Sequence, residues 1–194
     1  MDDKRRRQLE QVLLQLRDFP PSWRSFPTSD STGDLLGDVA TCTGDTQGAQ
    51  SVATAHSGEF RRGQQHITST AVAYPDQETV ARFAGVLGNA KAVHCMAQAL
   101  RPRVLAVVPD ASITGAHFTV QEGGVNVAIN YAGKTTGVVS ADAEGRPVHV
   151  DVDVVFILGN DFYSDITFIG VDTRVSEFIR HVLTDDVAFR AQQT

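Results

Sequence analysis

Four residues of one segment, His149, Asp151, Asp153 and Asp165, are of the types that bind divalent cations. The first three alternate along a β-rich run, and alternate residues of a strand point to the same face. Asp165 and Thr167 belong to the next run and would reach that face across a hairpin. Carboxylates and an imidazole that converge in this way could hold a metal ion and support a metal-dependent hydrolase. The alternative is the solvent face of a half-exposed strand, where Asp keeps a sheet edge soluble.

The segment that would position these side chains, residues 146–172, is predicted to form a β-hairpin. Its apolar residues follow a period of two, and Gly159 and Asn160 supply the turn. A three-residue loop, 159–161, places the apolar residues of both strands on one buried face. The pairs that this register predicts are Leu158 with Phe162, Val154 with Ile166 and Val152 with Phe168. Val155 and Ile157 continue the acidic face, which indicates that this second face is partly covered.

Other catalytic patterns are missing from the sequence. It has no GxxxxGKS/T phosphate loop, no GxGxxG that opens a helix after a strand, no HExxH and no GxSxG. Cys95 follows His94, but neighbouring residues of a helix point in different directions, so this pair is weak support for a thiolate nucleophile. With Cys42 the chain has two cysteines, too few for a cysteine-rich scaffold or a structural zinc site. They form either one disulfide or two buried thiols, and the count alone does not decide.

The rest of the chain predicts strands joined by short turns, with helices at the start, in the middle and at the end. Helices are expected at 2–17, around 35–39, after the N-cap Asp76, at 90–100 up to the breaker Pro102, and at 173–190. Strands are expected at 51–60, 65–74, 117–122, 125–132 and 135–141, before the hairpin. The fold class is therefore α+β, an antiparallel β-sheet with helices packed mainly on one face and an amphipathic C-terminal helix. Residues 1–194 are expected to form a single domain, in which 1–26 hold the first helix and a Pro-Pro-x-Trp segment and 27–49 are rich in loops.

Composition excludes some classes of partner. The chain of 194 residues is 42% hydrophobic and 21% charged, with a net charge of −6, as in ordinary globular domains. An acidic balance argues against general binding of nucleic acid or anionic membranes. No apolar run has the length of a transmembrane helix or of a signal-peptide core. The chain is expected either to be cytoplasmic or to be an exported domain without its leader.

Several short segments carry a family resemblance. They are LRDFPPSW ending at Trp23, Cys42-Thr43-Gly44, Val72-Ala73-Tyr74, ARFAGVLGNAKAVHCMAQAL with Cys95, and VDVDVVFILGNDFYSDITFIG before the last helix. In this order the chain resembles the extracytoplasmic sensor domain of PknH-type mycobacterial serine/threonine kinases and related exported mycobacterial lipoproteins. The resemblance implies an antiparallel sheet with packed helices, a groove that binds a ligand, no enzymatic activity and no cofactor. It also favours a Cys42–Cys95 disulfide. The kinase sensor domains have more cysteines, so a second disulfide of that family is missing here.

The leading hypothesis is therefore that residues 1–194 form a single sensor-like domain, an extracytoplasmic sensor or ligand-binding module without enzymatic activity. Its ligand would be a small apolar or amphipathic molecule, or a component of the cell envelope, held in a groove between sheet and helices. The residues expected to line this groove are Trp23, Phe26, Tyr131 and Tyr163. The alternatives are the metal-dependent hydrolase on the acidic face of the 147–170 hairpin, and a protein-interaction domain that dimerises through an exposed sheet face.

Overall fold

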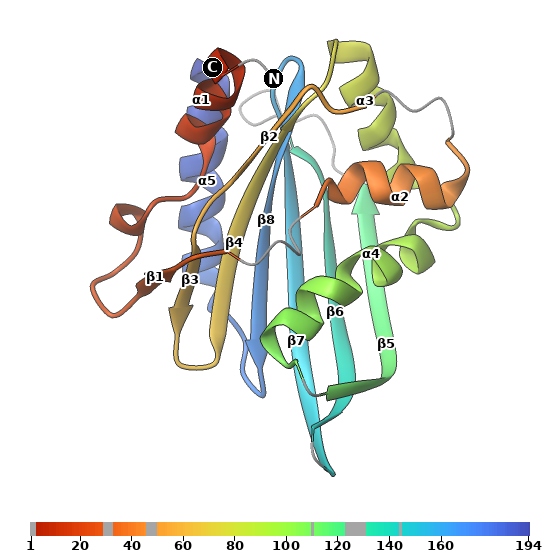
Figure 1. Cartoon of the computed structure of the whole chain (residues 1–194). Helices are drawn as coiled ribbons and strands as arrows, with labels where there is room; N and C mark the ends of the chain where they lie inside the picture. Colours follow the sequence, from red (N-terminus) through yellow and green to blue (C-terminus); the bar gives the residue numbers. More distant parts are fainter. Residues whose placement is uncertain (1–2, 29–32, 46–49, 110, 123–130, 144) are drawn as a thin grey trace.

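One antiparallel sheet contains all the described strands of the chain (Figure 1). The computed structural model describes residues 3–28, 33–45, 50–109, 111–122, 131–143 and 145–194. Within them, eight strands form a sheet of order β1-β3-β4-β8-β7-β6-β5, and β2 pairs with the part of β4 that β3 leaves open. The strands are β1 (Arg24–Phe26), β2 (Ala53–His56), β3 (Glu59–Arg62), β4 (Gln65–Ala73), β5 (Ala111–Glu122), β6 (Tyr131–Ala143), β7 (Arg146–Leu158) and β8 (Phe162–Val171).

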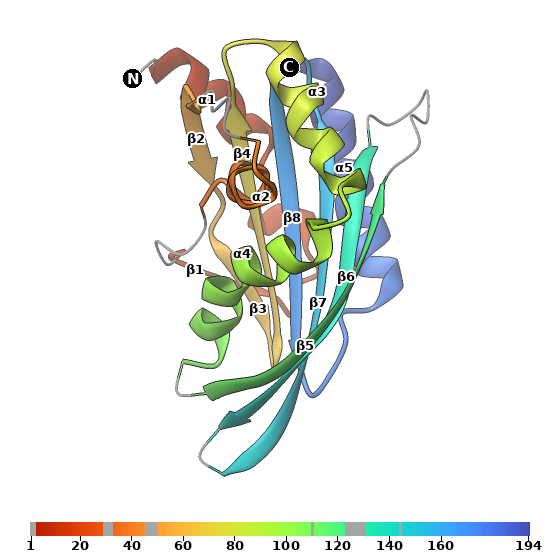
Figure 2. The ribbon, with the colours of Figure 1, turned by 90° about the vertical axis from the view of Figure 1, so that its right-hand side faces the viewer.

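Helices lie on both faces of this sheet. The α-helices are α1 (Asp3–Val12), α2 (Leu35–Thr43), α3 (Gln77–Gly85), α4 (Ala92–Val107) and α5 (Glu177–Gln193), with short 3₁₀ turns at Leu16–Asp18 and Val86–Gly88. Figure 2 shows α2, α3 and α4 in front of the sheet and α5 behind it. The predicted α+β class, antiparallel sheet and C-terminal helix are confirmed, and three of the described α-helices share one face. No helix in the described ranges is long and apolar enough to cross a membrane.

The two faces bury separate apolar clusters. Under α2, α3 and α4, the first cluster includes Val152, Val154 and Phe156 of β7. Under α1 and α5, the second includes Phe162, Ile166 and Phe168 of β8, together with Trp23 and Phe60. Because helices cover both faces, all ten residues of β8 are buried. This central strand therefore shows none of the alternation between apolar and polar residues that a sheet with one wet face would show.

The hairpin of β7 and β8 is confirmed, but its predicted register is wrong by one residue. Leu158 pairs with Tyr163, and Val154 pairs with Thr167. A shift by one residue moves every side chain of one strand to the opposite face. Asp165 therefore lies on the same face as Val154, under α2 and α4. The prediction assumed one buried face, and with two buried faces the apolar pattern cannot select the register.

Two other boundaries differ from the predicted ones. Pro102 does not end the fourth helix, because α4 continues to Val107 with Pro102 inside it. A proline in a helix removes one backbone donor and clashes with the preceding turn, and here the burial of the residues beyond it, Arg103 and Val104, favours the longer helix. Strands β5 and β6 are also longer than expected. Most of the predicted 125–132 strand lies outside the described residues.

Candidate functional site

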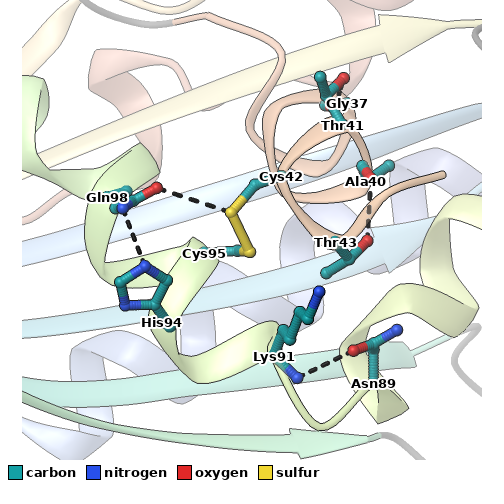
Figure 3. Close-up of a disulfide and its surroundings, with 10 residues drawn as sticks. All are labelled: Gly37, Ala40, Thr41, Cys42, Thr43, Asn89, Lys91, His94, Cys95 and Gln98. Carbon is teal, nitrogen blue, oxygen red and sulfur yellow. Dashed lines mark hydrogen bonds between the residues drawn. A yellow bond between two sulfur atoms is a disulfide. The ribbon is translucent and has the colours of Figure 1, made fainter. Parts of the chain in front are cut away.

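Helix α4 is attached to α2 by a covalent bond near its start. Cys42 of α2 and Cys95 of α4 form a disulfide between residues 53 positions apart, which confirms the expected pairing (Figure 3). Next to it, the side-chain amide of Gln98 lies 2.9 Å from Nε2 of His94. The same Gln98 is 3.6 Å from the sulfur of Cys42, and this is a packing contact because a disulfide sulfur has no proton to donate. The disulfide therefore fixes the helical turn that carries His94 and Gln98.

Near its end, α4 is attached to the centre of the sheet by a buried ion pair. The guanidinium of Arg103 donates to Oδ1 of Asp165 at 2.6 Å, and also to Thr167 and to the carbonyl of Gly33. Arg103 is 4% exposed and Asp165 is fully buried. Burial alone would lower the pKa of Arg103, but the charge of Asp165 and the hydrogen bond raise it above its ordinary value. Arg103 therefore stays charged beneath α4 and neutralises the carboxylate of Asp165.

A second buried polar group holds the start of α2. Asp34 is the N-cap of this helix and accepts a hydrogen bond from the backbone of Gly37. Its carboxylate also accepts from the hydroxyls of Tyr74 and Tyr163, the latter at 2.8 Å. Burial first, and then the charge of Asp34, raise the pKa of both tyrosines. The two phenols therefore remain protonated hydrogen-bond donors. Together with Asp34 they hold the start of α2 in place.

An open groove lies between α4 and the edge of the sheet. Its volume is about 180 Å³, and we call it the α4–β5 groove. Its lining residues are His94, Ala97, Gln98, Leu100, Arg101 and Val104 of α4, Ile113, Ala116 and Phe118 of β5, and Val139 of β6. The floor is apolar, while the α4 side also presents an imidazole, an amide and a guanidinium. This combination suits a small molecule with an apolar body and a polar end.

The floor of this groove depends on one glycine of β6. A Cβ at Gly137 would collide with the ring of Phe118 on β5 and lie 2.7 Å from the carbonyl of His117. Phe118 is 5% exposed and rests where that side chain would be. Because Gly137 has no Cβ, the Phe118 ring can lie against β6. The ring therefore does not rise from the groove floor toward α4.

The four aromatic residues expected to line a groove are not brought together. Trp23 is 3% exposed and packs against Phe19 in the cluster under α1 and α5. Phe26 is partly exposed on the edge strand β1, under the guanidinium of Arg61. Tyr163 is buried under α2 and α4, on the face of the sheet opposite to that of Trp23. Tyr131 begins β6 and pairs with Ile157, and its side chain lies outside the described part of the chain. A role for any of them in binding stays a prediction.

The acidic residues of the hairpin are also separated. Asp165 faces α4, whereas Asp153 faces α5 and pairs with Arg180 at 2.8 Å and with Arg174 at 3.6 Å. His149 and Asp151 lie on the face of Asp153, nearer the start of β7. Across the described ranges, no group of three or more His, Cys, Asp or Glu residues is placed to hold a metal ion. The predicted convergence rested on the hairpin register that the structure corrects.

Sequence reasoning did not select any of the residues of the α4–β5 groove for binding. A usable signal was present, because His94, Gln98 and Arg101 follow the spacing of one helix face. That pattern was hidden by the expectation that Pro102 ends the helix. The second wall, β5, was predicted only from residue 117 onward, so Ile113 and Ala116 were left in a loop.

Comparison with known proteins supports the fold. No family model matches the chain, and no curated protein sequence matches it. Among solved structures, it is similar to the crystal structure of the extracellular domain of PknH from Mycobacterium tuberculosis. The identity is 12%, the match covers 97% of each chain, and the TM-score is 0.50. The resemblance predicted from the sequence is thereby confirmed at the level of the fold that the two chains share.

Proposed function

We propose that this chain is an extracytoplasmic sensor or ligand-binding domain that holds a small amphipathic molecule in the α4–β5 groove. The observation that carries this proposal is the groove itself, with Phe118, Ile113 and Val139 as an apolar floor beneath the polar side of α4. Small-molecule sites in proteins are concave and mostly apolar, with a few polar groups that orient the ligand.

Two further observations support an extracytoplasmic location. The Cys42–Cys95 disulfide is typical of oxidising compartments. The solved structure of similar fold is an extracellular domain. A sensor outside the cytoplasm would use such a disulfide to keep α4, one wall of the groove, attached to α2.

Binding without catalysis is favoured by where the perturbed groups lie. Shifted pKa values often accompany catalytic sites. Here the pKa values of Tyr74, Tyr163 and Arg103 are raised in side chains under α2 and α4, where the two phenols donate to Asp34 and the guanidinium donates to Asp165. They satisfy buried charges and hydroxyls, and they are not lining residues of the groove.

Isothermal titration calorimetry with 1-octanol tests the proposal. Wild-type protein should give a saturable binding isotherm with a stoichiometry of one 1-octanol per chain. Ala116→Trp should abolish it, because Ala116 is an exposed residue of the groove on β5 and an indole there fills the space. Thr119→Trp is the matched control, since Thr119 is exposed on the opposite face of the same strand. Absence of a saturable heat, or full binding by Ala116→Trp, would show that the groove is not the site.

A second candidate function is self-association through α5. Phe178 and Phe189 of α5 are 74% and 62% exposed, the highest values among the exposed large apolar residues of the described chain. They are separated by three helical turns and therefore lie on the same side of α5, opposite the buried Ile179, Leu183 and Val187. In an antiparallel pair of α5 helices from two copies, each Phe178 would face Phe189 of the other copy.

Sedimentation velocity over a range of concentrations tests this second candidate. The wild type should form dimers as concentration rises, and Phe178→Ser with Phe189→Ser should remain monomeric. Val93→Ser serves as the control, because Val93 is an apolar residue on α4 that is 41% exposed and does not belong to α5. A wild type that stays monomeric at the highest concentration would rule the candidate out.

A further inference from the structure

The α4–β5 groove has a positive charge at its rim that the domain does not neutralise. Arg101 lines the groove and is exposed. Within the described residues it has no hydrogen bond or ion pair, whereas Arg103 and Arg180 pair with buried carboxylates. Unlike those two, Arg101 has its guanidinium available for a ligand.

The ionisable side chains that line the groove are all basic. None of its lining residues is acidic, and His94 and Arg101 are the titratable ones among them. The whole chain, by contrast, carries a net charge of −6. Arg101 therefore places an uncompensated positive charge beside the apolar floor, and a planar guanidinium matches a carboxylate or phosphate by two parallel hydrogen bonds.

We propose that the ligand of the α4–β5 groove is an anionic amphiphile, a short hydrocarbon chain that ends in a carboxylate or a phosphate. This inference rests on the proposed function of the groove. The chain would lie over Phe118, Ile113 and Val139, and Arg101 would bind the anionic end, with the amide of Gln98 as a further donor. About 180 Å³ gives room for roughly six water-sized groups, so the chain is short, with the anion at the mouth.

This arrangement predicts how the affinity depends on the length of the ligand's chain and on the charge of its head. Each added methylene that reaches the apolar floor should strengthen binding about fourfold, until the groove is full. An exposed ion pair contributes modestly, so the anion should be preferred over a neutral head of equal chain length by about fivefold. The preference should fall as salt is added, because Arg101 is open to solvent.

Calorimetric titrations of the full chain with octanoate, octyl phosphate, 1-octanol and octylammonium test the proposal. Both anions should bind more tightly than 1-octanol, and octylammonium should bind more weakly. The carboxylate and phosphate titrations also distinguish which anionic head is preferred. Arg101→Gln should remove the preference, and Arg101→Lys should restore part of it. Arg24→Gln is the matched control, since Arg24 is exposed on β1 at the opposite edge of the sheet.

The outcomes separate this inference from the proposed function. If 1-octanol binds, Ala116→Trp blocks it and octanoate has no advantage, the groove is a binding site but the anionic class is wrong. A preference for octanoate that survives Arg101→Gln also refutes the assignment to Arg101. If none of the probes binds, the proposed function and this inference fail together.

Discussion

The ion pair of Arg103 and Asp165 leads to a prediction with opposite outcomes for single and double substitutions. Arg103→Met leaves the carboxylate of Asp165 buried and, among the described residues, with the hydroxyl of Thr167 at 3.3 Å as its remaining side-chain donor. Asp165→Leu leaves a guanidinium that is 4% exposed without its counter-charge. Both single variants place an uncompensated charge in the apolar cluster under α4. The double variant, Arg103→Met with Asp165→Leu, removes both charges and keeps much of the volume.

The magnitude follows from the burial of the two groups. Breaking a buried ion pair by removing one partner costs about 3–5 kcal/mol, while replacing both partners with apolar residues is often neutral or stabilising. We therefore expect each single variant to lose about 4 kcal/mol of unfolding free energy, and the double variant to stay within about 1 kcal/mol of wild type. Domains are stable by only about 5–15 kcal/mol, so the single variants should remain folded but fragile.

Urea unfolding followed by fluorescence measures this directly. Trp23 is the only tryptophan in the sequence and is 3% exposed in the cluster on the other face of the sheet, so its emission reports loss of the whole fold. With a slope of about 2 kcal/mol per molar urea, each single variant should shift the midpoint by about 2 M. Arg101→Met is the control, an exposed arginine on the same helix. Single variants that cost less than about 1 kcal/mol, or a double variant as unstable as the sum of both, would refute the reasoning.

Three further predictions concern the neighbouring contacts. Reduction of the Cys42–Cys95 disulfide, which closes a loop of 53 residues, should lower the unfolding free energy by about 4 kcal/mol in the chain-entropy model, as measured by urea unfolding with and without reductant. Tyr163→Phe removes the 2.8 Å hydrogen bond to Asp34 and should cost about 1–3 kcal/mol; an unchanged thermal midpoint would contradict this. Gly137→Ala forces the ring on the groove floor upward, so it should weaken 1-octanol binding in calorimetry while far-UV circular dichroism stays unchanged.

Local sequence signals were sufficient for the parts of the fold that depend on near neighbours. Asp76 was predicted as an N-cap, and its side chain accepts from the backbone of Thr79. The β7–β8 hairpin was predicted from alternation and from its Gly-Asn turn, and both strands form where expected. These features involve residues a few positions apart, so composition and spacing determine them.

The residues at the candidate site depend on contacts that no local pattern encodes. Asp165 was included in the alternative hypothesis of a metal site, because its partner, Arg103, is 62 positions away on a helix that was expected to end before it. Tyr163 was expected to line a groove, but α2 covers it and its hydroxyl donates to Asp34. In both cases the polar side chain has no partner nearby in the sequence, so it was considered as a contact to a ligand. In the structure, a distant part of the chain supplies its partner.

Helix α4 explains how one element can be both structural and available for binding. Cys95 and Arg103, which attach it to α2 and to β8, fall on one side of the helix. His94, Gln98 and Arg101 fall on another side and face the groove. A covalent bond and a buried ion pair hold the helix, and Leu100 and Val104 pack in the same apolar cluster as Phe118 of β5. These contacts leave His94, Gln98 and Arg101 at the groove, and under the proposed function these polar side chains would contact the ligand.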